Sequence, residues 1–222
     1  MEELINIKNI NVKFNEEVIF NNFDIGFYKN KTNCILGKSG CGKTTLLNIL
    51  SGIKENDTDY INEMQDLKIS YIFQEDRLID WLNVEENIKL TSRGKYNDDL
   101  DNICNRYLNL VGLRKYKNKY PQMLSGGMRQ RVNIARGLVY PSDVIIMDEP
   151  FKSIDIKNKE DIMREVKNIL KNEDRTIIFV THDIDEALFL GENIIVLGNR
   201  PVSIKISLEN NKLTKDEIIM YI

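Results

Sequence analysis

Gly37-Lys38-Ser39-Gly40-Cys41-Gly42-Lys43-Thr44 is the most informative segment of this 222-residue chain. It fits the pattern G-x-x-x-x-G-K-[ST], in which glycines let the backbone curl until its N–H groups point at phosphate oxygens. An apolar run at residues 32–36 predicts a short strand before this loop, and residues 44–50 predict a helix after it. The positive end of the helix dipole adds to the attraction for anions. The stretch therefore predicts a site for the phosphates of a nucleotide.

Two side chains of the loop have specific expected roles. Lys43 should reach the β- and γ-phosphates, and the Thr44 hydroxyl should ligate Mg²⁺. A glycine-rich turn that binds nothing is the alternative, but a chance match somewhere in such a chain has a probability under roughly 1%. The residues expected to contact the nucleotide here are Gly37, Ser39, Gly40, Cys41, Gly42, Lys43, Thr44 and Thr45.

A second group of functional residues follows the apolar run at residues 144–147, which predicts a strand buried on both faces. At the ligand side of a parallel sheet, the next two residues can face the phosphate loop. Asp148 is placed to hold Mg²⁺, and Glu149 is placed to polarise the attacking water as a general base. An acidic surface turn before Pro150 is the alternative, which the presence of the phosphate loop makes much weaker.

The rest of the chain has the organisation of an α/β protein. Apolar and polar residues roughly alternate through residues 4–27, which predicts several short strands. Helical spacing dominates residues 84–138. Further short apolar runs at residues 144–147, 176–180 and 194–197 alternate with helical segments. This alternation predicts a parallel sheet with crossovers and a helical block inserted between its two parts.

The composition excludes several classes of protein. Lys and Arg total 31 against 34 Asp and Glu, a net charge of -3, so no nucleic acid is expected as a partner. The three cysteines show no CxxC spacing, which argues against a zinc site or a disulfide framework. No apolar run approaches the roughly 18–20 residues that span a bilayer, so a role at a membrane would require another chain as the anchor.

The segment that indicates a particular protein family is Leu124-Ser125-Gly126-Gly127-Met128-Arg129-Gln130-Arg131. This stretch resembles the signature segment, of LSGGQ type, of the ATP-binding-cassette (ABC) ATPases, with Met128 where Gln is commonest. Four more positions resemble family motifs in the family's order: Phe14 for the aromatic residue on adenine, Gln74 for the Q-loop, Asp155 for the D-loop and His182 for the switch histidine.

The resemblance covers about residues 3–205 and implies the fold. It implies an α/β P-loop NTPase of ABC type, with a parallel-sheet core, an N-terminal antiparallel β-subdomain and an inserted helical subdomain. Residues 1–222 would form one ABC ATPase domain. Its nucleotide-binding core would comprise about residues 1–74 and 139–222, and its helical subdomain about residues 75–138.

The resemblance also implies a second copy of the chain. Ser125, Gly126 and Gly127 lie at the start of a helix with bare N–H groups, which suits a γ-phosphate. In the family this segment serves the ATP of the partner subunit in a head-to-tail dimer that encloses ATP and Mg²⁺. The alternative is an ordinary Gly-Gly helix start.

The remaining motif residues keep alternatives of their own. His182 would contact the γ-phosphate, although a lone histidine is more often structural. Gln74 would ligate Mg²⁺ and report the phosphate state, or would simply be a polar residue at a strand end. Asp155 would sit at the subunit seam, or cap the following helix, and both can be true. Phe14 would stack on adenine or belong to the core. The catalytic residues expected are thus Glu149, His182, Lys43 and Gln74, with Thr44, Gln74 and Asp148 at the metal.

The stretch from Phe73 to Leu82 resembles the nitrate, sulfonate and taurine importer branch of the family. Asp76 and Asp80 replace the usual prolines there, and Lys152 is a further departure. Trp81, the only tryptophan, is either a core aromatic or part of a groove for a membrane partner's helix. In the second case, Asp76 and Asp80 are expected to meet basic residues of that partner.

The resemblance implies the ATP-hydrolysing subunit of an importer on the cytoplasmic face of the cell membrane. Its partners would be a second copy of itself, membrane permease subunits and, indirectly, a solute-binding protein. The solute would be like nitrate, a sulfonate, taurine or a thiamine precursor, and its identity is set by other chains. A soluble or exporter-type ABC ATPase is the alternative.

Overall fold

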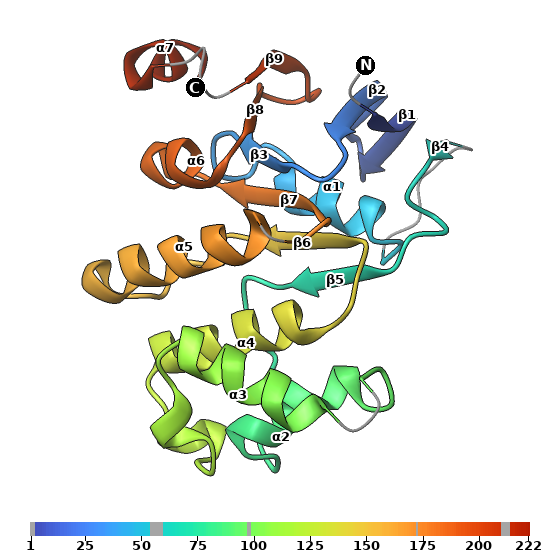
Figure 1. Ribbon diagram of the computed structural model, residues 1–222. Coiled ribbons are helices and arrows are strands. Elements are labelled where there is room, and N and C mark those ends of the chain that lie inside the picture. Colours follow the sequence, from blue (N-terminus) through green and yellow to red (C-terminus); the bar gives the residue numbers. More distant parts are fainter. Residues whose placement is uncertain (1–2, 54–59, 97–98, 172, 210–213) are drawn as a thin grey trace.

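The computed structural model of the chain describes residues 3–53, 60–96, 99–171, 173–209 and 214–222. Two sheets and several helices make up this part (Figure 1). In chain order the elements are β1 (Leu4–Phe14), β2 (Glu17–Tyr28), β3 (Thr32–Leu36), α1 (Lys43–Leu50), β4 (Ile61–Asn62), β5 (Ile69–Ile72), α2 (Val84–Lys89), η1 (Leu90–Ser92), α3 (Leu100–Leu110), η2 (Arg114–Tyr116), η3 (Pro121–Met123), α4 (Gly126–Val139), β6 (Val144–Asp148), α5 (Ile156–Lys171), β7 (Thr176–Thr181), α6 (Ile184–Leu190), β8 (Asn193–Leu197), β9 (Ile204–Glu209) and α7 (Lys215–Tyr221).

The larger sheet has the strand order β5-β6-β7-β3-β8-β9. Its first five strands pair in parallel, as the alternation of strands and helices predicts. The prediction of a parallel sheet is incomplete at one edge, because β9 pairs antiparallel with β8. A tight return between the two strands explains this direction, with the N–H of Gly198 donating to the carbonyl of Ser203 at 2.8 Å.

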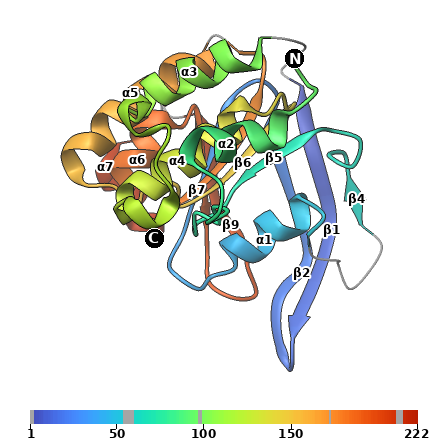
Figure 2. The ribbon, with the colours of Figure 1, turned by 90° about the horizontal axis from the view of Figure 1, so that it is seen from below.

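The smaller sheet, β2-β1-β4, differs from the expectation of several short strands in residues 4–27. This region is one long antiparallel hairpin of β1 and β2, which Figure 2 shows extending to one side of the molecule. Register shifts between Ile7 and Ile10 and between Ile10 and Val12 break the alternation of buried and exposed residues. Asn9, inside the first shift, has a φ of 62°. Such bulges interrupt the period of two without ending the strand.

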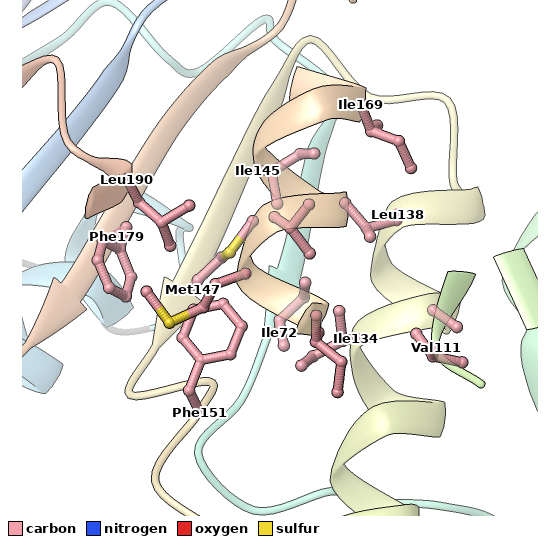
Figure 3. Close-up of a cluster of buried hydrophobic side chains, with 14 of the residues drawn as sticks. Ile72, Val111, Ile134, Leu138, Ile145, Met147, Phe151, Ile169, Phe179 and Leu190 are labelled. Carbon is pink, nitrogen blue, oxygen red and sulfur yellow. The ribbon is translucent and has the colours of Figure 1, made fainter. Parts of the chain in front are cut away.

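The core lies on both faces of the larger sheet, whose central strands are buried along their whole length. One cluster joins the sheet to α4 and α5 and includes Ile72, Leu138, Met147 and Phe179 (Figure 3). The other joins the sheet to α1 and the hairpin. Because helices and the hairpin cover its two faces, the sheet offers functional side chains mainly from the loops at its edge.

Helices α2, α3 and α4 pack together below β5 in the view of Figure 1. Residues 84–138 are therefore largely helical, as their spacing predicts. The division of the chain at about residues 74 and 139 stays a prediction. Within the described ranges, no helix combines the length and the apolar character that crossing a bilayer requires.

Candidate functional site

The loop after β3 curls around the amino group of Lys43. Nζ of Lys43 donates to the carbonyl oxygens of Gly37 and Lys38 at 2.6 and 2.9 Å. Gly42, with a φ of 127°, adopts a conformation that suits glycine, and a Cβ there would come 3.1 Å from a methyl group of Ile19. Position 42 of the loop therefore requires glycine, both for the backbone turn and for the close contact with β2. The loop leads directly into α1, with Lys43 as its first residue.

Asp148 lies opposite this loop, at the end of β6. Its Oδ2 accepts a 2.8 Å hydrogen bond from the Thr44 hydroxyl. Its Oδ1 is buried and accepts no hydrogen bond from any residue that the structure describes. Burial raises the pKa of Asp148, and the hydrogen bond from Thr44 only partly opposes this. A hydroxyl beside an unsatisfied carboxylate oxygen is a donor set that fits Mg²⁺.

Glu149 follows in a strained conformation, with a φ of 44°, and its N–H donates to the carbonyl of Val180 at 3.0 Å. Its Oε1 lies 3.1 Å from Nδ1 of His182, and its Oε2 lies 2.9 Å from Nζ of Lys152. Burial alone would raise the pKa of Glu149, but the Lys152 and His182 side chains outweigh burial and lower it. The carboxylate is therefore held in its ionised form.

Parallel strands bring these groups together. The phosphate loop follows β3, Asp148 ends β6 with Glu149 directly after it, and His182 follows β7. These three strands are neighbours in the order β6-β7-β3. The carboxyl ends of parallel strands meet at one edge of a sheet. Glu149 and His182 are 33 residues apart in the chain, yet they touch.

Gln74 lies just beyond β5, at the same edge, and is exposed. It lines a cavity of about 550 Å³ together with Glu75, Arg129 and Lys152. The structure gives Gln74 no contact with Thr44 or Asp148, so its predicted place at the metal stays a prediction.

The Ser125 segment begins α4 in the way its sequence predicts. Ser125 is the N-cap residue, and its hydroxyl accepts from the N–H of Met128 at 3.3 Å. A Cβ on Gly126 would meet nothing within 4 Å, whereas a Cβ on Gly127 would come 3.1 Å from the carbonyl oxygen of Ser153. Figure 1 shows α4 below β5 and α1 above it, so this helix start lies away from the chain's own phosphate loop.

Exposure and contacts bear on three residues for which the sequence left alternatives, although the place of Asp155 at the subunit seam stays a prediction. Asp155 caps the start of α5, since its Oδ1 accepts from the N–H of Asn158 at 3.2 Å. Phe14 is 52% exposed at the end of β1, so the interpretation as a core residue is wrong. Trp81 is 79% exposed, and its interpretation as a core aromatic is also wrong.

The expectation that Asp76 awaits a basic residue of another chain needs correction. Asp76 accepts two hydrogen bonds from Arg129 of its own chain, at 2.8 and 3.0 Å. Asp80 lies 3.8 Å from the same guanidinium. The hydrogen bonds from Arg129 are the largest reason why the pKa of Asp76 is lowered.

Sequence reasoning missed the part of Lys152 in this site. The only sequence signal was its spacing of three residues from Glu149, across Pro150 and Phe151. It also missed Lys159 of α5, which pairs with Asp183 at 2.8 Å and with Glu186. Glu186 in turn accepts a 2.6 Å hydrogen bond from Thr181, next to His182.

Comparisons with known proteins agree with this geometry. The sequence profile of the family described as ABC transporter matches residues 20–152. The chain is 37% identical over 204 residues to the aliphatic sulfonates import ATP-binding protein SsuB of Bacillus thuringiensis subsp. konkukian, covering 87% of this chain and 79% of that protein. It is 34% identical over 203 residues to the corresponding SsuB 1 of Pseudomonas savastanoi pv. phaseolicola, covering 91% and 84%.

A solved structure agrees in fold. It is the dimeric post-hydrolysis state of the ATP-binding cassette MJ0796 bound to ADP and Pi, with a TM-score of 0.80 and 29% identity, covering 95% of this chain and 100% of that one. The resemblance stated for the signature segment is thereby confirmed, as are the fold class and the branch of the family. The chain belongs to the ABC transporter ATP-binding family and is an ATPase that binds and hydrolyses ATP.

Proposed function

We propose that this ATPase energises an importer of a small solute, as one of two identical subunits beneath membrane permease partners. Sulfonates are the favoured solute class, because the relatives from Bacillus and Pseudomonas carry the description of aliphatic sulfonate import. Nitrate, taurine and a thiamine precursor remain further candidates from the same branch. The place of work would be the cytoplasmic face of the membrane.

The observation that carries the catalytic proposal is the contact of Glu149 with His182 at 3.1 Å, at the sheet edge that also holds the phosphate loop. Glu149 is kept ionised, so it can accept a proton from water or orient the water for attack. His182 holds one oxygen of that carboxylate. Its other role would be contact with the γ-phosphate.

The phosphate loop would hold ATP through its backbone N–H groups and Lys43. Two of the ammonium's three hydrogens are directed to carbonyl oxygens of the loop, which fixes the amino group and leaves one for a phosphate oxygen. Thr44 and Asp148, with Gln74 as a further candidate, would hold Mg²⁺. That ion supplies charge neutralisation on the phosphates.

The second copy would complete the site. The N–H groups at the start of α4, beside Ser125, Gly126 and Gly127, suit a γ-phosphate but lie away from the chain's own loop. A head-to-tail dimer would bring them to the partner's ATP. The exposed Asp155, which starts α5 near the same segment, would lie at the seam. Phe14, exposed at the end of β1, would stack on adenine.

Replacing Glu149 by Gln tests the catalytic proposal. The variant should bind ATP normally, form a lasting dimer and lose turnover by about 10²-fold or more, because the proton acceptor is gone. Glu165→Gln, at an exposed position of α5, is the matched control and should behave like the unmodified chain. Ordinary turnover in the Glu149→Gln variant would disprove the role of this residue.

The importer proposal has its own test. The chain is purified from its native membrane, and its ATPase activity is measured with and without candidate solutes on a solute-binding protein. Co-purification of a permease and stimulation by an aliphatic sulfonate would support the proposal. A complex with soluble partners alone would favour the soluble ABC ATPase, and a permease without a solute-binding protein would favour an exporter.

A further inference from the structure

Lys152 lies against the carboxylate of Glu149, three residues after it in the chain. Its Nζ is 2.9 Å from Oε2 of Glu149, while Nδ1 of His182 is 3.1 Å from Oε1. Both oxygens of the carboxylate therefore face a nitrogen of a neighbouring side chain. A general base needs one of them to face the water that it activates.

The local backbone fixes this contact. The N–H of Lys152 donates to the carbonyl oxygen of Glu149 at 3.3 Å, which closes a turn over residues 149–152. Glu149 itself is held with a φ of 44° and by the hydrogen bond from its N–H to Val180. The two side chains thus leave the same turn on the same side. The turn, the bond to Val180 and the contact with His182 together fix where the Glu149 carboxylate meets Lys152.

The ion pair is of a kind that can open. The Lys152 side chain is 51% exposed, whereas that of Glu149 is only 12% exposed. Because the lysine end of this pair is well solvated, water can replace Glu149 as a partner of the ammonium group, and salt screens that side of the pair. Lys152 also lines the cavity of about 550 Å³ that contains Glu75 and Gln74. Its ammonium group therefore has solvent and a second carboxylate within its surroundings when it leaves Glu149.

We propose that Lys152 is a positioning residue that acts as a brake on hydrolysis, by holding Oε2 of Glu149 away from the attacking water. Turnover then requires Lys152 to swing toward the cavity. The inference rests on the proposed role of Glu149 as the base. It concerns the fraction of time for which that base is available, and it leaves the binding of ATP untouched.

The test compares steady-state ATP hydrolysis of the purified chain with that of Lys152→Ala and Lys152→Gln. Both variants should raise kcat two- to fivefold with KM for ATP unchanged, because the restraint on the base is removed and no residue assigned to nucleotide binding is changed. Lys152→Arg, which keeps the positive charge, should bring kcat back toward that of the unmodified chain. Lys115→Ala, at an exposed lysine of η2, is the control and should change neither constant. A fluorescent ATP analogue and a thermal melt show that each variant is folded.

A second background separates this inference from the proposed function. Lys152→Ala combined with Glu149→Gln should turn over no faster than Glu149→Gln alone, because there is no base to release. If Glu149→Gln is inactive but Lys152→Ala leaves kcat unchanged or lowers it, the brake is wrong and the role of Glu149 stands. If Glu149→Gln keeps ordinary turnover, the proposed function itself fails. If Lys152→Ala does not fold, the kcat of Lys152→Gln is compared with that of Lys152→Arg, and this comparison tests the brake in the same way.

Discussion

The Thr44 hydroxyl donates a 2.8 Å hydrogen bond to Oδ2 of Asp148 and so joins the start of α1 to the end of β6, 104 residues later in the chain. The second oxygen of Asp148 is buried and accepts no hydrogen bond within the described residues. A buried carboxylate oxygen without a hydrogen-bond partner is costly. The pair of Thr44 and Asp148 therefore affects both the function and the stability of the chain.

Asp148→Asn should raise stability while it weakens Mg²⁺-dependent binding of ATP. Burial raises the pKa of Asp148 above its ordinary value of 3.8. A raised pKa means that this group favours folding below its unfolded pKa and that this contribution is lost as the pH rises through the folded pKa. At pH 7 the ionised carboxylate thus opposes folding, and its removal should raise Tm by about 2–4 °C. Calorimetry measures Tm, and titration with a fluorescent ATP analogue, with Mg²⁺ or with a chelator, measures binding. A lower Tm at pH 7 would contradict the prediction.

Asp76→Asn should destabilise the chain by about 1 kcal/mol at neutral pH, because it breaks the charge-assisted bonds from Arg129. The pKa of Asp76 is lowered from 3.8, so its contribution is fully present above that value and is lost as the pH falls through the lower, folded pKa. Urea unfolding at a series of pH values should show the difference from the unmodified chain shrinking below about pH 4. Asp66→Asn, at an exposed aspartate outside this cluster, serves as the control. A difference that is the same at every pH would argue against an ionic origin.

Trp81 provides a spectroscopic signal without labelling, because it is the only tryptophan. With 79% of its surface exposed, its fluorescence in the isolated chain should be that of a hydrated indole and should be quenched readily by iodide. Binding to the permease should shift the emission to shorter wavelength and protect it from iodide. Trp81→Ala should leave Tm unchanged within about 2 °C but weaken association with the permease. An emission that stays the same in the complex would place this residue outside the interface.

Gly137→Ala should destabilise the chain by about 1–3 kcal/mol, although alanine is normally the better helix former. A Cβ at Gly137 of α4 would lie 2.3 Å from Cγ1 and 2.8 Å from Cδ1 of Ile72, so the Ile72 side chain, the helix or β5 must move. Chemical denaturation measures the effect. Adding Ile72→Ala to this variant should cost less than Ile72→Ala costs in the unmodified chain, because the new methyl group fills part of the space. Additive losses would contradict this explanation.

Local patterns were sufficient for much of the fold and of the site. The strands β3, β6, β7 and β8 are continuous apolar runs, and their parallel pairing places the loops after them at one edge. The position of Asp148 and Glu149 at the same sheet edge as the phosphate loop could therefore be predicted from the sequence. The strand β9 could not, because all six of its residues are exposed or partly exposed, so it has no continuous buried run.

The remaining differences arise from contacts between distant or differently oriented side chains. Arg129 and Asp76 are 53 residues apart in the chain, and no pattern in the sequence predicts that they form a pair. Lys152 is close to Glu149 in sequence, but only the strained turn shows that their side chains face each other. The exposure of Trp81 depends on how the helices and loops around it pack. The sequence alone could therefore not show whether Trp81 is a surface residue or a core residue.

The position of β3 in the middle of the sheet has a consequence for the synthesis of this protein. The strand that carries the phosphate loop pairs with β7 and β8. Asn33 of this strand forms hydrogen bonds with Ile177 and Asn193, which come 144 and 160 residues later in the chain. At a translation rate of about 5–20 residues per second, the growing chain must wait roughly 7–30 seconds for those neighbours. Until they leave the ribosome, the glycine-rich loop has no sheet to hold it, and ATP cannot assist the folding of the nascent chain.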